Sequence, residues 1–239
     1  MKRNKYPPKT VKADGENIHI KHKITPKNTA QALYIDSLRE QPLTICNGPA
    51  GSGKTYIVTA IALEKLINQE VDRIIITRPV VEAGENLGFL PGTLEEKLDP
   101  YLLPLLDSIE NHVGPVMTKK LLETRKIEIA PLAFMRGRTF NNCYVILDEA
   151  QNATVEQVKM FVTRLGFDSF FAINGDTSQS DLRKPKGAGD NWENGLQYIV
   201  RKLKGRDEKI NYIEFYNRDV VRSQLVQRIL NLLDAPDNF

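Results

Sequence analysis

Cysteine, tryptophan and long apolar stretches are all scarce in this chain of 239 residues. Of its two cysteines, Cys46 and Cys143, each lies inside a short apolar run and not at the spacing of metal ligands. We expect both to be reduced core residues, which argues against a disulfide scaffold or a zinc site. No apolar run approaches the ~20 residues that span a bilayer, and the N-terminus has no signal-peptide core. We therefore expect a cytoplasmic protein without a membrane partner.

The net charge of +3 is small but unevenly distributed. Residues 1–28 contain eight Lys and Arg against two acids, and the rest of the chain contains 25 against 28. A basic arm of this size can contact phosphate backbones, but it is more often a solvated tail. We expect residues 1–24 to form this arm and residues 25–239 to form one domain, because the length suits a single α/β core.

Short apolar runs alternate with segments of helical period along most of the chain. The runs predict strands at 43–46, 73–77, 127–130, 144–147, 170–173 and 210–215. Helices are predicted at 55–68, 155–165 and 223–233, and another is expected to begin with Thr25 as its N-cap and Pro26 in its first turn. Fully apolar strands between helices predict an α/β fold with a mainly parallel sheet covered on both faces.

Residues 79–114 interrupt this alternation with several glycines and prolines. The segment is long for a connection in a compact domain, so we interpret it as a functional insertion. Its apolar positions, Leu98, Leu102, Leu105 and Leu106, predict a packing face. That face would meet either a neighbouring subunit or the chain's own domain.

A phosphate-binding loop is predicted directly after the first strand, where residues 48–55 match G-x-x-x-x-G-K-[ST] in full. Glycines let successive N–H groups turn toward phosphate oxygens, and the helix that follows adds its positive N-terminus. Lys54 would bridge the β- and γ-phosphates, and the Thr55 hydroxyl would bind Mg²⁺. We expect ATP and Mg²⁺ as ligands, since no N-K-x-D segment for guanine occurs. The predicted nucleotide contacts are Gly48, Pro49, Ala50, Gly51, Ser52, Gly53, Lys54, Thr55 and Tyr56.

Two acidic residues follow the apolar run at 144–147. Asp148 is placed to hold Mg²⁺ at the end of a neighbouring strand, and Glu149 is the candidate general base that polarises the attacking water. An acidic pair after a strand is often only a loop cap. Its combination with the phosphate loop predicts a hydrolytic site.

A third polar segment, residues 174–179, follows the apolar run at 170–173 and reads Asn-Gly-Asp-Thr-Ser-Gln. An amide and a carboxylate at the end of this strand could lie opposite the γ-phosphate. The alternative is an ordinary turn that contains Asp and Gly.

The segments GPAGSGKT, VILDEAQN and INGDTSQ, in this order, resemble the PhoH family, which is related to superfamily one helicases and has a RecA-like core. The resemblance covers about residues 27–233. It implies an ATPase coupled to RNA or single-stranded nucleic acid, and a homo-oligomeric ring such as a hexamer. It also implies residue roles: an adenine contact for Gln31, γ-phosphate sensing for Gln179, an arginine finger in cis or in trans for Arg222, and nucleic-acid contacts for Arg78, Arg136 and Arg138.

The chain departs from ordinary helicases because no second RecA-like domain and no fused nuclease domain is recognised. Strand separation by one copy is therefore not expected. Two other functions stay open: a phosphotransferase that acts on a small molecule, and an assembly module gated by ATP. The glutamate beside Asp148 favours water as the acceptor, because a kinase would exclude it.

Overall fold

The computed structural model describes residues 12–13, 16–21, 23–80, 94–182, 184 and 192–221. Its centre is a six-stranded sheet in the order β5-β4-β6-β7-β3-β8, and every neighbouring pair is parallel. The predicted α/β fold with a parallel sheet is confirmed. The strands are β3 (Leu43–Asn47), β4 (Arg73–Arg78), β5 (Ile127–Pro131), β6 (Cys143–Leu147), β7 (Phe170–Gly175) and β8 (Ile210–Glu214).

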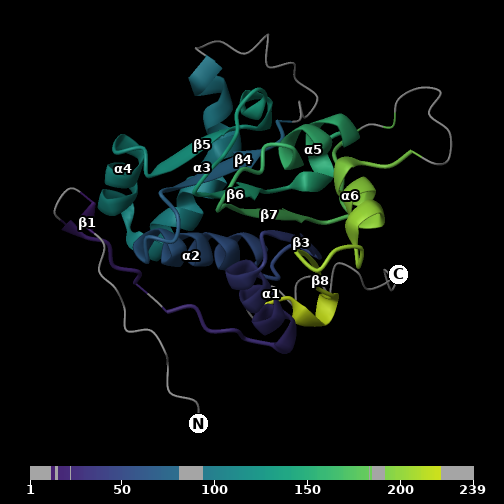
Figure 1. Cartoon of the computed structure of the whole chain (residues 1–239), viewed down its shortest axis with the longest axis horizontal. Helices are drawn as coiled ribbons and strands as arrows, with labels where there is room; N and C mark the ends of the chain where they lie inside the picture. Colours follow the sequence, from purple (N-terminus) through teal and green to yellow (C-terminus); the bar gives the residue numbers. More distant parts are fainter. Residues whose placement is uncertain are drawn as a thin grey trace, which may run out of the picture.

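Helices lie on both sides of this sheet (Figure 1) and enclose two separate apolar cores. Neighbouring strand residues point to opposite faces, so Ile74 and Ile76 enter one core while Ile75 enters the other. The first core is covered by α1 (Thr29–Glu40), α2 (Lys54–Ile67), α3 (Leu94–Val113) and α4 (Pro115–Glu123). The second is covered by the 3₁₀ turn η2 (Leu132–Met135), α5 (Val155–Val162) and α6 (Gly195–Leu203).

The start of α1 corrects the sequence prediction, because its N-cap is Asn28 and not Thr25. The Asn28 side-chain oxygen accepts the Gln31 backbone N–H at 2.8 Å, and the Lys27 N–H donates to Gln31 Oε1 at 2.8 Å. Asparagine is at least as good a cap as threonine, and this reciprocal pair stabilises the later start. Pro26 therefore precedes the helix.

Part of the predicted insertion is a regular helix. In α3, Leu105 and Ile109 are buried in the first core and Leu102 packs against it, so this face meets the chain's own domain. Residues 81–93 and the Leu98 side chain lie outside the described residues, as does the predicted helix at 223–233. The sequence patterns did not predict α4 and α6.

Residues of the predicted basic arm, 1–24, contact the α/β domain. Two short strands, β1 (Lys12–Ala13) and β2 (Glu16–Asn17), pair antiparallel, and Ile18 then enters the first core. The Lys21 N–H donates to the His112 carbonyl at 2.8 Å. None of the helices that the structure describes is long and apolar enough to cross a membrane.

Candidate active site

The phosphate loop connects β3 to α2 at the carboxyl end of the sheet. The Gly48 N–H donates to the Gly175 carbonyl at 3.1 Å. A Cβ at Gly48 would lie 2.5 Å from Phe215 Cβ, so only glycine fits between the loop and the chain after β8. Gly53 has φ +89° and caps α2, where a left-handed backbone favours glycine. The free N–H groups at the start of α2 therefore face the loop as an anion site.

Lys54 and Thr55 begin α2, and their side chains contact different parts of the site. Lys54 Nζ donates to the carbonyls of Gly48 at 2.6 Å and Pro49 at 3.0 Å, which places the ammonium group inside the loop. The Thr55 hydroxyl donates to both carboxylate oxygens of Asp148 at 3.1 Å. The loop and the acidic strand end are therefore in direct contact. The strand β7 lies between β3 and β6 in the sheet, so β6 is not the direct neighbour of β3 that we expected from the sequence.

Asp148 follows β6, and its backbone N–H donates to the Thr77 carbonyl at 2.9 Å. The side chain is only 5% exposed. Burial, assisted by the neighbouring Glu149 charge, raises the pKa of Asp148 to about 6, while the Thr55 hydrogen bond and the charges of Arg78 and Lys54 oppose the rise. A buried carboxylate with a raised pKa is stabilised by a cation, so this position suits a metal ion.

Gln151 joins Glu149 to the end of β7, a role that the sequence patterns did not predict. Its Nε2 donates to Glu149 Oε2, and its Oε1 accepts the Asp176 backbone N–H at 3.0 Å. Glu149 itself has φ +53°, an uncommon conformation for a residue other than glycine. A Cβ at Gly175 would lie 2.5 Å from Gln151 Oε1, so glycine leaves room for the bridge. The sequence signal that could have predicted this role is the amide of Gln151, two residues after Glu149.

The third segment lies beside the phosphate loop, because β7 pairs with β3. Asn174 accepts the Tyr34 hydroxyl at 2.6 Å, and Asn47 Oδ1 accepts the Thr177 N–H at 2.9 Å. Asp176 Oδ1 accepts from Ser178, whereas Asp176 Oδ2 is buried without a hydrogen-bond partner among the described residues. Asn174 Nδ2 is also buried without a hydrogen-bond partner among the described residues, so the segment is tied into the site and leaves two polar atoms for a ligand.

The other residues with a predicted role in nucleotide binding or catalysis have different surroundings. Gln31 is buried and donates from Nε2 to the Ser52 carbonyl at 3.0 Å, so it supports the loop from behind. Tyr56 is partly exposed, and its ring lies 4.2 Å from that of His112. Gln179 is exposed at the end of the third segment. Arg222 lies outside the described residues, but the Val221 N–H donates to the Gly51 carbonyl at 3.0 Å.

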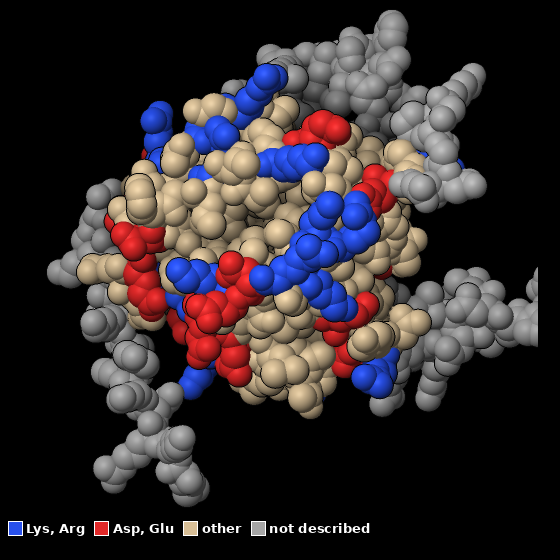
Figure 2. Space-filling view, turned by 45° about the vertical axis from the view of Figure 1, so that its right-hand side comes forward, with Lys and Arg blue, Asp and Glu red and all other residues tan. Residues whose placement is uncertain are grey.

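The three arginines predicted to contact nucleic acid have different surroundings. Arg78 ends β4, and its charge opposes the rise in the pKa of Asp148 that burial causes. Both Nη atoms of Arg138 donate hydrogen bonds to the Glu128 carboxylate, one at 2.7 Å, and these bonds lower the pKa of Glu128. The Arg138 guanidinium also lies over the Phe140 ring. Arg136 is exposed. Figure 2 shows a band of Lys and Arg, with acids on either side, across the face that carries α5 and α6.

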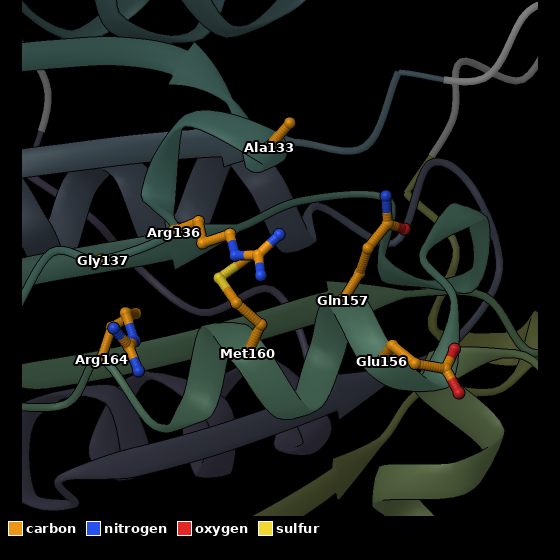
Figure 3. Close-up of a pocket in the computed structure, with 7 residues that line it drawn as sticks. All are labelled: Ala133, Arg136, Gly137, Glu156, Gln157, Met160 and Arg164. Carbon is orange, nitrogen blue, oxygen red and sulfur yellow. The ribbon is translucent and has the colours of Figure 1, made fainter.

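A surface depression of about 790 Å³ lies between the η2 turn and α5. Figure 3 shows Arg136 extending from the turn toward Met160 of α5. Arg164 lies at one end of the depression, and Glu156 and Gln157 lie at the other. Sequence reasoning had named Arg136 but neither Arg164 nor Met160.

The donor atoms of the site fit a hard cation. No group of three or more His, Cys, Asp or Glu side chains that could cage a metal occurs among the described residues. Mg²⁺ does not need such a cage, since it binds one or two carboxylates together with substrate phosphates and water. The Thr55 hydroxyl beside the Asp148 carboxylate would supply the protein's share of this ligand set.

Comparison with solved structures supports the fold alone. A large terminase from a thermophilic bacteriophage, in complex with ADP, superposes with a TM-score of 0.51 at 13% sequence identity. The match covers 89% of this chain and 51% of the terminase.

Sequence relatives are much closer. The PhoH-like protein of Bacillus subtilis is 48% identical over 94% of this chain and 66% of its own length. Protein PhoH of Escherichia coli K12 is 45% identical over 87% of this chain and 57% of its own length. The chain thus spans less than two thirds of either relative. The family model described as PhoH-like protein matches residues 23–234, so this chain belongs to the PhoH-like protein family.

Proposed function

We propose that this chain is a Mg²⁺-dependent ATPase whose turnover is coupled to RNA or to single-stranded nucleic acid. The observation that carries the ATPase proposal is the contact between the Thr55 hydroxyl and the Asp148 carboxylate, next to Lys54 in the phosphate loop. This is the arrangement in which P-loop enzymes hold a metal nucleotide.

Each residue at the end of the sheet has a distinct task in this proposal. The loop N–H groups and Lys54 bind the phosphates, and Thr55 with Asp148 holds Mg²⁺. The metal, when bound, neutralises charge that develops on the β- and γ-phosphate oxygens. Glu149 orients and deprotonates the attacking water. Gln151 is a positioning residue, because it fixes the Glu149 carboxylate and ties it to the β7 end.

Water is the acceptor that this geometry favours. Glu149 is partly exposed beside the buried Asp148, so its carboxylate is accessible to water. A phosphotransferase would instead need a pocket for its small-molecule acceptor at the same point. An assembly module gated by ATP would use the same residues but would not respond to nucleic acid.

Coupling to nucleic acid is supported by family membership and by the surface charges. The basic band in Figure 2 provides cations along one face, and phosphate backbones bind such bands through release of counterions. Gln179 is exposed where the β7 end meets the surface. These features support a nucleotide-sensing segment within reach of a bound strand.

Arg222 is proposed as the arginine finger, either in cis or across a subunit boundary of a homo-oligomeric ring. The preceding residue, Val221, contacts the phosphate loop through its N–H and the Gly51 carbonyl, which motivates this proposal. Mixing Arg222→Ala subunits with Glu149→Gln subunits tests the trans role. Restored activity in the mixture supports a shared site, and no rescue at any ratio means that Arg222 acts in cis or not at all.

Steady-state ATP hydrolysis with and without single-stranded RNA, across a salt series, tests the whole proposal. We expect hydrolysis that requires Mg²⁺ and a stimulation by RNA that weakens as salt rises. Hydrolysis without any response to RNA or to single-stranded DNA would favour the assembly module. Transfer of the phosphate to an added small molecule would favour the phosphotransferase.

A further inference from the structure

We infer that the depression between η2 and α5 binds unpaired nucleotides, an inference that rests on the proposed coupling to nucleic acid. Its volume of about 790 Å³ lies inside the ~300–1,000 Å³ range of small-molecule sites. Cationic, apolar and amide groups all line it, from two elements on the same side of the sheet.

The cationic groups differ in how they are held. Arg136 is exposed and extends into the depression (Figure 3). Arg164 is fixed, since its two Nη atoms donate to the Arg138 carbonyl and the Thr163 hydroxyl, both at 3.1 Å. Arg164 Nε is buried without a hydrogen-bond partner among the described residues. Because this Nε is buried, Arg164 contributes its charge and Arg136 contributes the accessible donors, so a phosphate group would bind at the arginine end and away from Glu156.

Arg138 is excluded from this site by its own contacts. Both of its Nη atoms are held by Glu128 on β5, and it does not line the depression. The family resemblance predicts a nucleic-acid contact for both Arg136 and Arg138. The structure separates them into one cation available to a ligand and one that stabilises the fold.

An exposed aromatic ring lies on the same turn as the available arginine. Leu132 and Met135 of η2 are buried in the second core, which leaves Phe134 on the outside with 53% of its surface exposed. Single-stranded nucleic acids bind where aromatic rings stack on bases and cations follow the backbone. Phe134 does not line the depression, but it lies two residues before Arg136 on the same turn and supplies that ring. Met160 supplies apolar surface within the depression.

The depression is also connected to the catalytic residues through a short segment of the chain. Thr154 and Gln157 form a capping box at the start of α5. The preceding 3₁₀ turn, η3 (Ala150–Asn152), contains Gln151, which holds Glu149. Gln157 lines the depression, so a bound strand contacts the helix that continues from the Gln151 turn. This connection offers a route by which nucleic acid changes ATP turnover.

The test is fluorescence anisotropy of a labelled single-stranded oligouridylate with the full chain across a salt series. Arg136→Ala should weaken binding about fivefold at physiological salt and reduce the slope of log affinity against log salt by about 0.7, because one phosphate contact is lost. Phe134→Ala should weaken binding about tenfold and leave that slope unchanged, because the ring carries no charge. Lys119→Ala, on the highly exposed surface of α4, is the matched control and should bind like the parent.

The outcomes separate the inference from the proposed function. If RNA stimulates ATP hydrolysis but both variants bind like the parent, the site assignment is wrong and the proposed function stands. If Arg136→Ala weakens oligonucleotide binding but leaves the slope of log affinity against log salt unchanged, Arg136 does not contact a phosphate. Competition by polyglutamate with no effect of Phe134→Ala would assign the depression to an acidic protein instead. If the parent neither binds the oligonucleotide nor responds to RNA, the proposed coupling itself fails.

Discussion

The carboxyl end of the sheet and the η2–α5 surface hold their polar side chains in opposite ways. At the sheet end, Asp148, Gln151 and Asp176 are each at most 7% exposed and lie in a hydrogen-bonded region that spans β3, β6 and β7. On the η2–α5 surface, Arg136 and Phe134 are exposed on a short turn. Groups that act on a phosphate must keep one geometry, whereas groups that bind a moving strand must stay accessible. The difference is consistent with the proposals that the first region carries the ATPase chemistry and that the second binds nucleic acid.

The largest expected effect is on chemistry at the sheet end. Glu149→Gln should lower kcat for ATP hydrolysis by about 10²–10⁴-fold, the usual contribution of a general base, while ATP affinity stays near that of the parent. Phosphate release and a titration with fluorescent ATP measure the two quantities, and Glu123→Gln on exposed α4 is the control. An equal loss of ATP affinity would mean that Glu149 binds the nucleotide instead.

A second effect tests how tightly the sheet end is packed. Gly175→Ala should destabilise the fold by about 2–3 kcal/mol, because the new Cβ meets Gln151 Oε1 at 2.5 Å and Leu196 Cδ2 at 2.7 Å. Gly205→Ala is the control, since its Cβ meets nothing within 4 Å and only its left-handed backbone is strained, at about 1 kcal/mol. Urea unfolding measures both, and equal losses would contradict the close packing around Gln151.

Asp148→Asn should stabilise the metal-free fold at neutral pH by roughly 3 kcal/mol. The folded pKa of Asp148, about 6, lies above its ordinary value of 3.8, so the folded state binds the proton more tightly. Stability of the parent therefore falls as pH rises between these values, and the variant lacks this loss. Thermal unfolding in EDTA across pH should show a difference that disappears below about pH 4. If Asp148→Asn is less stable than the parent at pH 8, the buried Asp148 charge does not destabilise the metal-free fold.

The smallest expected effect separates the two arginines near η2. Arg138→Ala should lower stability by about 1 kcal/mol, because it leaves Glu128 without its partner at a partly exposed site. Arg136→Ala should leave stability unchanged, since its side chain is exposed. Parallel urea unfolding of the two variants makes the comparison, and equal stabilities would remove the distinction between a structural and an available arginine.

The strands and the phosphate loop could be predicted because their signals are local. Apolar runs of five or six residues and the pattern that ends in Lys54-Thr55 depend on neighbours in sequence. The Gln151 bridge could not be predicted, because its partners Glu149 and Asp176 come together only when β6 pairs with β7. Arg136 and Arg138 have the same residue type, and tertiary contacts distinguish them, because only Arg138 pairs with Glu128 and stacks on Phe140. The N-cap of α1 depended on competition between Thr25 and Asn28, which composition alone does not decide.

Phosphate release from Mg²⁺-ATP by the parent chain and by Lys54→Ala, with saturating single-stranded RNA, tests the central claim most directly. Lys54 is the cation inside the phosphate loop, so its loss should lower turnover to background while the fold persists. Circular dichroism of the variant confirms the fold. Turnover that depends on Lys54 and rises with RNA is the expected result. Equal turnover by the two proteins would contradict the claim that ATP is hydrolysed at the end of this sheet.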